Sequence, residues 1–137
     1  MANEAAIRDR LAEPIDFTVA DGTGIEKGTL LKISDPRTAS ASDTEGEACA
    51  GIAAREKVAD DGRTQLAVYT KGIFDMYASG AITVGQSVMS AGVANEVKIA
   101  AVTASGASII GHALETAADK ETVQIYVNIG AGGQQIS

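Results

Sequence analysis

The chain of 137 residues has a single cysteine, Cys49, and this scarcity limits its chemistry. An intramolecular disulfide needs two thiols and a cysteine-rich metal site needs several, so the sequence excludes both within one chain. This usage fits synthesis in a reducing compartment. Cys49 stands beside alanines with no basic cluster nearby, which favours a buried, inert side chain over a reactive thiolate.

Basic residues are also in short supply. Eleven Lys and Arg stand against 18 Asp and Glu, which gives a net charge of -7. Binding to a phosphate backbone draws on clustered Lys and Arg, so we expect no nucleic-acid partner and interpret the spread acidic charge as favouring solubility. The sequence lacks a run of about 18 apolar residues, and its first residues lack the basic and apolar regions of a signal peptide. We therefore expect neither membrane association nor export by a signal peptide.

Aromatic residues make up only 4% of the chain, and tryptophan is absent. Much of the 45% hydrophobic content is alanine. Small side chains bury little area each, at about 25 cal/mol per Å² of apolar surface. A core built from them leaves an isolated monomer marginally stable, so we expect the protein to form an oligomer or to work docked on something larger.

Strand-like alternation is abundant, and it is clearest in residues 64–89. Apolar residues alternate with polar or small ones, and β-branched and aromatic residues resume after Gly72. A glycine inside such a pattern marks a bend or bulge, so Gly72 is predicted to be the corner of one long bent strand or strand pair. Ser79 and Gly80 are predicted to form a turn, after which a further strand begins at Ile82.

The rest of the chain carries the same β pattern with turn punctuation. Residues 37–47 are polar and are predicted to form a mobile surface loop. The predicted turns lie at residues 21–24, 35–36 and 60–62. The further predicted strands are residues 15–19, 29–34, 49–54, 96–102 and 122–129.

The two halves of the chain resemble each other in the order of their motifs. Three matches in the same order and at a nearly constant offset predict two structurally similar β halves. The matches are Gly28 with Gly85 (offset 57, 85 minus 28), Gly51 with Gly111 (60, 111 minus 51), and residues 64–72 with 122–130 (58, 122 minus 64).

The ends of the chain stand apart from this pattern. Residues 1–14 carry Ile7 and Leu11 as their only large apolar side chains, spaced for one face of a short helix that ends before Pro14. So short a segment cannot by itself offset an ordering cost of about 1–2 kcal/mol per residue. We expect an N-terminal arm that is mobile until it docks, as a helix or as an added strand, and a flexible tail over residues 131–137.

No arrangement typical of an active site is evident in the sequence. His112, the only histidine, stands in an apolar stretch, where a packed or hydrogen-bonded structural imidazole is the favoured interpretation. Asp43, Glu45 and Glu47 could hold a cation, but the calcium-loop spacing is absent, and a solvated acidic loop is favoured. Neither GxGxxG nor GxxxxGK[ST] occurs. We expect no enzymatic activity, no cofactor and no metal site.

Four motifs occur in a fixed order. They are a glycine corner at Gly72-Ile73-Phe74, a run with spaced glycines from Ser79 to Val88, an Ile-Gly-x-Ala strand at residues 110–113, and a closing strand of the VQIYV type. This arrangement, over residues 15–130, resembles the small capsid decoration (cement) proteins of tailed viruses, the DUF2190 family. These motifs are structural glycines and apolar positions, so the resemblance brings no active site with it.

The resemblance implies an all-β fold, with a small β-barrel or β-tulip-like domain of two similar halves over residues 15–130. It further implies a structural protein of a bacteriophage virion, made in the host cytoplasm. Such a protein would form a homotrimer on the outside of an icosahedral head and stabilise the head by bridging major capsid protein subunits. In the arm over residues 1–14, we expect Ile7, Leu11 and Pro14 to contact the capsid.

Two other classes of function stay open at this stage. A small β-barrel module that binds a host surface or a glycan would present exposed aromatic residues, and the lack of tryptophan speaks against it. A small hydrolase would have to rely on His112 and on serines. Loss of a measurable activity in His112→Ala, without unfolding, would favour that class.

Overall fold

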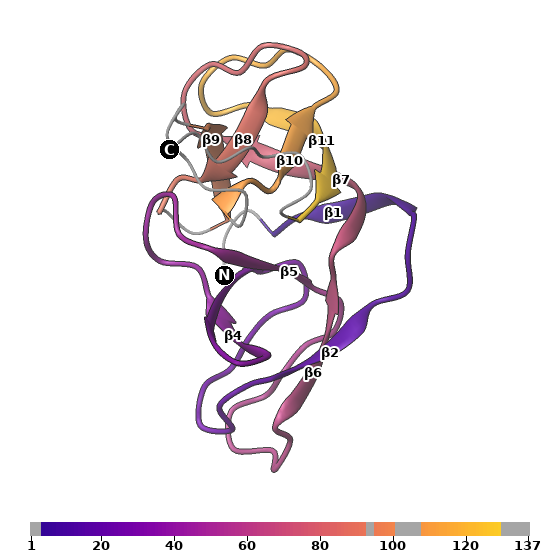
Figure 1. Ribbon diagram of the computed structural model, residues 1–137, viewed down its shortest axis with the longest axis vertical. Helices are drawn as coiled ribbons and strands as arrows, with labels where there is room; N and C mark the ends of the chain where they lie inside the picture. Colours follow the sequence, from indigo (N-terminus) through magenta and orange to yellow (C-terminus); the bar gives the residue numbers. More distant parts are fainter. Residues whose placement is uncertain (1–3, 93–94, 101–107, 130–137) are drawn as a thin grey trace.

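The computed structural model describes residues 4–92, 95–100 and 108–129. Figure 1 shows two β-barrels stacked along the long axis, so the predicted all-β fold is confirmed. No helix among the described residues is long and apolar enough to cross a membrane. The strands are β1 (Ala6–Arg10), β2 (Ile15–Thr18), β3 (Leu30–Asp35), β4 (Thr38–Ala41), β5 (Cys49–Ala53), β6 (Gln65–Tyr69), β7 (Lys71–Ala78), β8 (Ser87–Ser90), β9 (Glu96–Ile99), β10 (Gly111–Ala113) and β11 (Thr122–Asn128).

The first barrel closes in the order β2-β4-β3-β5-β6. β2 pairs antiparallel with β6 and meets β4 in parallel at Thr18 and Thr38, which completes the ring. Strand alternation turns one set of side chains inward, where burial of apolar area stabilises the barrel. This core consists of Phe17, Val19, Ile25, Leu31, Ala39, Ala50, Ala53, Leu66 and Val68.

The second barrel repeats the same ring with β7-β9-β8-β10-β11. β7 pairs antiparallel with β11 and in parallel with β9, at Tyr77 and Glu96. Buried and half-buried residues alternate along the whole of β7, so that Phe74 and Met76 point into the barrel. The prediction of two similar halves is confirmed, and each half closes into a barrel of its own.

Equivalent glycines occupy equivalent places in the two barrels, as predicted. Gly28 and Gly85 precede β3 and β8 with φ angles of 87° and 88°, a left-handed conformation that glycine adopts without strain. The N–H of Gly28 donates to the carbonyl of Ala53, and that of Gly85 to the carbonyl of Ala113. The two turns therefore hold the same strand pair in each barrel.

The predicted offset between the closing strands is wrong by one residue. Ala53 pairs with Val68 in the first barrel, and Ala113 pairs with Ile125 in the second. The offset of β11 from β6 is therefore 57 (125 minus 68) rather than 58. A slip of one residue would turn every core side chain outward, so the buried positions decide the register.

The corner between the barrels lies at Thr70, between β6 and β7, and the prediction that placed it at Gly72 is wrong. Gly72 is instead a point of close approach. A Cβ there would lie 2.9 Å from the ring of Phe74 and 3.0 Å from the carbonyl oxygen of Asp9. Ser79 and Gly80 form the predicted turn, but β8 begins only at Ser87.

The prediction of a mobile loop over residues 37–47 is also wrong for its first half. Residues 38–41 form β4, which pairs with β3 and seals the first barrel. Ala39 is buried in the core, and Pro36 and Arg37 make the tight turn between the two strands. The segment has little large apolar area, and the alanine that enters the core is too small to give a strong strand signal.

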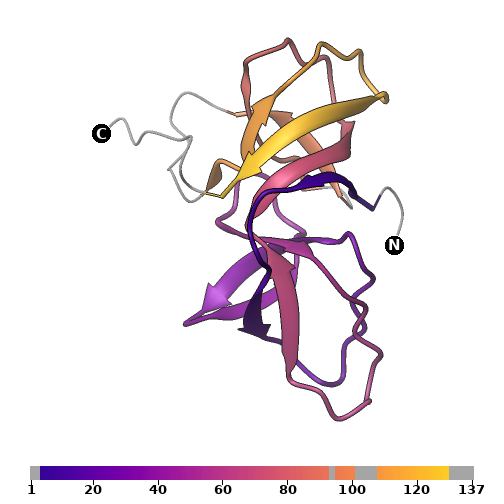
Figure 2. The same cartoon turned by 90° about the vertical axis from the view of Figure 1, so that its right-hand side faces the viewer.

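The N-terminal segment differs from the predicted arm. Residues 6–10 form β1, which precedes the first barrel in the sequence but is not one of its strands. It pairs antiparallel with β7 of the second barrel, with a bulge between Ile7 and Asp9 (Figure 2). Ala5 is buried, and its N–H donates to the carbonyl of Gly28 over 2.8 Å. The predicted strand addition therefore occurs within the chain. The predicted tail, residues 131–137, lies outside the described residues.

Candidate functional site

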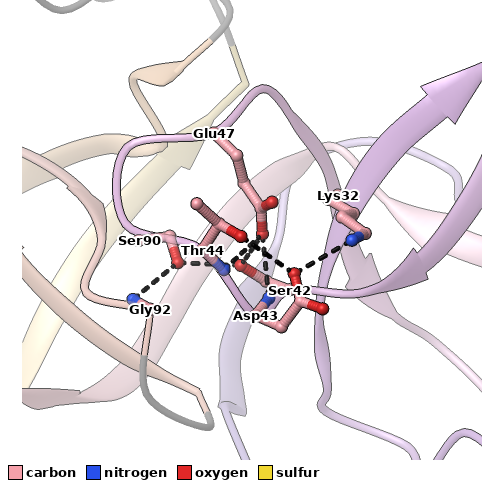
Figure 3. A network of polar contacts seen from close by, with 7 residues as sticks. All are labelled: Lys32, Ser42, Asp43, Thr44, Glu47, Ser90 and Gly92. Carbon is pink, nitrogen blue, oxygen red and sulfur yellow. Dashed lines mark hydrogen bonds and ion pairs between the residues drawn. The ribbon is translucent and has the colours of Figure 1, made fainter.

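A polar network joins the two barrels at the loop that follows β4 (Figure 3). One carboxylate oxygen of Glu47 accepts three hydrogen bonds, from the hydroxyl of Ser42 at 2.6 Å and from the backbone N–H groups of Asp43 at 2.9 Å and Thr44 at 3.2 Å. A carboxylate that accepts several donors holds a loop in one conformation. Hydrogen bonds between its own residues therefore hold the loop in shape.

The second barrel meets this loop through Ser90. The hydroxyls of Ser42 and Ser90 lie 2.8 Å apart in a buried position, and the N–H of Gly46 donates to the carbonyl of Ser90. The hydroxyl of Ser108 donates to the carbonyl of Gly46 over 2.7 Å. Because buried polar groups need partners, these bonds fix how one barrel sits on the other.

The carboxylates of the predicted acidic loop point to different partners. Asp43 pairs with Lys32 at 2.9 Å, a hydrogen bond that lowers the pKa of Asp43 and raises that of Lys32. Glu45 pairs with Lys98 at 3.1 Å, and Glu47 closes the loop. Among the described residues, no group of three His, Cys, Asp or Glu side chains is placed to hold a metal ion.

Apolar contacts between the barrels lie beside this network. Leu30 and Ile52 point away from the core of the first barrel and join the core cluster of the second. The ring of Tyr69 meets that of Phe74 edge to face, with centroids 5.6 Å apart. Cys49 is buried in the same contact, as predicted, and burial raises the pKa of its thiol to about 12. A thiol with so high a pKa stays protonated near neutral pH and is therefore not activated for nucleophilic attack.

Lys57 forms a charged cluster that the sequence analysis missed. Its side chain is 1% exposed, and its ammonium donates to the carboxylates of Asp21 at 2.9 Å and Asp61 at 2.8 Å. It also donates to the backbone carbonyls of Asp21 and Val58. Burial opposes the charge, but the hydrogen bonds to Asp61 and Asp21 raise the pKa of Lys57. The Lys57–Asp61 spacing of four residues was the available signal.

His112 differs from its prediction. The side chain is exposed on the outer face of β10, and its ring stacks on that of Tyr126 in β11, with centroids 5.4 Å apart. Its counterpart Ile52 is buried because the other barrel covers it. The imidazole therefore belongs to an outer surface of the second barrel, with an aromatic neighbour.

The three residues predicted to contact a capsid take different positions. Ile7 is partly buried against the core of the second barrel, whereas Leu11, in the link between β1 and β2, is 45% exposed. Pro14 is half-buried immediately before β2. Ile15, the next residue, is 41% exposed. The link and the first residue of β2 therefore present two large apolar side chains, while Ile7 anchors β1 beside them.

Comparisons with known proteins agree with this architecture. The N base of the head fiber gp8.5 of bacteriophage phi29 has a similar fold, with 19% identity and a TM-score of 0.55 over 83% of this chain and 93% of that chain. No curated protein matches the chain. A family model described as phage cement protein matches residues 10–129. The chain therefore belongs to the phage cement protein family, and its role is that of a structural protein associated with the phage capsid.

Proposed function

We propose that the protein binds the outside of an icosahedral phage head as a homotrimer and stabilises it by bridging major capsid protein subunits. The match of the cement family model over residues 10–129 carries this proposal. The two barrels are locked together by buried contacts, and a rigid body of this kind transmits load between the subunits it touches. The proposal needs no cofactor and no catalytic group, and it places the protein in the virion.

The link between β1 and β2 is the proposed capsid contact. Leu11 is exposed and Pro14 keeps the chain extended before β2, so the pair can enter an apolar depression on a shell subunit. Ile7 contributes indirectly to this contact. Its packing holds β1 on β7 and so fixes the position of the link.

The test is attachment to heads that lack the protein. Leu11→Asp should reduce occupancy on such particles by about tenfold or more at a concentration where the wild type just saturates them, because a central apolar anchor is lost. Particle-bound protein is measured by cosedimentation and located by electron microscopy. The control is Val58→Asp, which changes a residue that is 58% exposed in the connection between β5 and β6.

Equal occupancy of Leu11→Asp and wild type would remove the link from the interface and leave the family role intact. Wild-type protein that never binds purified heads would remove the proposed function itself.

A further inference from the structure

The repeat lets each surface of one barrel be compared with its counterpart on the other. Within the chain, the side face of the first barrel, formed by Leu30, Ile52 and Tyr69, packs on the mouth of the second barrel at Phe74. We use "side face" and "mouth" for these two surfaces. Their contact buries apolar side chains on both barrels. Face-to-mouth packing therefore already occurs once within the chain.

The counterpart of the side face on the second barrel is open. In the first barrel Ile52 pairs with Leu30 and with Tyr69, and in the second His112 pairs with Ser87 and with Tyr126. Ser87 therefore corresponds to Leu30, His112 to Ile52 and Tyr126 to Tyr69. His112 is exposed, and the other two are half-buried. Val84 and Leu114 flank them at 56% and 37% exposure. This open side face lies on β8, β10 and β11, the strands labelled in the upper barrel of Figure 1.

The counterpart of the mouth, on the first barrel, is open as well. Phe74 pairs with Ile125, and Ile15 pairs with Val68, which is the equivalent of Ile125. Phe74 is buried against Tyr69, whereas Ile15 is 41% exposed with Leu11 nearby in the link. The position that holds an inter-barrel contact in one barrel is therefore an exposed apolar rim in the other.

We propose that the open side face of one copy receives the open mouth of a second copy, which repeats between chains the packing that joins the two barrels within a chain. The inference rests on the proposed function in one respect, because it names the surfaces by which the homotrimer would form. The two surfaces differ, so the contact is heterologous and is completed by closure into a ring.

A second copy is the occupant that the surfaces favour, because both complementary parts are on the same chain. Of the seven large apolar residues that are exposed in the described part of the chain, three lie on these two surfaces: Ile15, Val84 and Leu114. Ser87 and His112 make the open face more polar than Leu30 and Ile52 make its counterpart. The contact between copies should therefore be weaker than the contact within the chain and should depend on concentration.

The first experiment is sedimentation velocity of the full chain over a range of concentrations. Ile15→Lys in the mouth and His112→Glu in the face should each weaken self-association by about tenfold or more, since a charge enters an apolar contact. The control Val58→Lys should associate like the wild type. Circular dichroism checks that each variant is folded, and Leu114→Lys replaces His112→Glu if that variant is not.

Mixing the two variants gives the sharper test. Ile15→Lys keeps an intact face and His112→Glu keeps an intact mouth, so their mixture should form a mixed dimer that neither variant forms alone. An interface that pairs face with face or mouth with mouth would not be rescued in this way. The proposal is overturned if the wild type stays monomeric, if both variants associate like the wild type, or if the mixture stays monomeric. If both variants associate like the wild type, the face-to-mouth contact is contradicted while binding to phage heads is not. Failure of the wild type to bind heads would instead contradict the proposed function.

Discussion

At the scale of single residues, Lys57 is the least predictable feature of the fold. A lysine in a polar turn region is normally exposed, and nothing local says that the ammonium will turn inward. Its counterpart in the second barrel is Ala117, which forms the equivalent backbone bridge, to Ile82 as Lys57 does to Ile25. The buried charge therefore belongs to one barrel alone, and only the full placement of the turns at Asp21 and Asp61 reveals it.

The Lys57 cluster predicts a sensitivity to acid. The hydrogen bond from Lys57, with help from the N–H of Arg63, lowers the pKa of Asp61 to about 2. An unfolded aspartate titrates near pH 4 (about 3.9), so the stabilisation is complete above that value and is lost as the pH falls toward about 2. Thermal midpoints measured across this range should fall more steeply for wild type than for Lys57→Met with Asp61→Asn. Parallel curves would show that the cluster does not contribute.

Two glycines in equivalent strands should not tolerate replacement by a residue that has a side chain. A Cβ on Gly51 would collide with the carbonyl oxygen of Tyr69, and one on Gly111 with that of Tyr126. Gly111→Ala should lose about 3 kcal/mol or more, because backbone on both strands must shift. The matched control is Gly22→Ala, whose nearest atom would be 3.8 Å away. Urea unfolding compares the two variants, and equal stabilities would contradict the close approach.

The burial of single residues was predicted correctly where the neighbouring sequence determines it. It was predicted wrongly where contact with the other barrel determines it. Burial of Cys49 follows from its alanine neighbours. Exposure of His112 does not follow from its apolar neighbours, because Gly111–Ala113 is too short to show alternation, and the inter-barrel contact that buries Ile52 has no equivalent there.

At the scale of elements, the loop of residues 42–47 should depend on Glu47. Glu47→Ala removes the acceptor of three hydrogen bonds and leaves the buried hydroxyl of Ser42 with fewer partners. We expect a loss of about 1–3 kcal/mol. Amide exchange at Asp43 and Thr44 should also accelerate. Glu45→Ala, which breaks an exposed pair with Lys98, should change stability by less than about 1 kcal/mol. A reversed order of the two variants would contradict this account.

Strands with strong alternation between glycine turns were predictable, and two others were not. β4 is made of small and polar residues, so its place depends on pairing with β3. The segment that contains β1 has apolar residues at Ile7 and Leu11, a spacing of four that indicates a helix, and the strand form of β1 comes from pairing with β7, far away in the sequence. Pairing between distant segments leaves no local signature.

At the scale of the whole molecule, the repeat predicted two similar halves but not that each would close. Closure depends on the parallel contacts of β2 with β4 and of β7 with β9, which are short and have little sequence signal. The packing of one barrel on the other depends on Leu30, Ile52 and Phe74, which are ordinary core residues by type. Sequence patterns identify that such residues are buried, but not against which barrel.

The pairing of β1 with β7 has a consequence for the order of folding. Ala6 meets Asp75, so β1 leaves the ribosome nearly seventy residues (75 minus 6) before its partner strand is complete. The first barrel can close once β6 has emerged, because its strands all lie between Ile15 and Tyr69. Contacts between distant residues form late, since the intervening chain must first be ordered. During synthesis the completed first barrel would therefore carry β1 as an unpaired strand, and the newborn chain is most open to wrong partners in that interval.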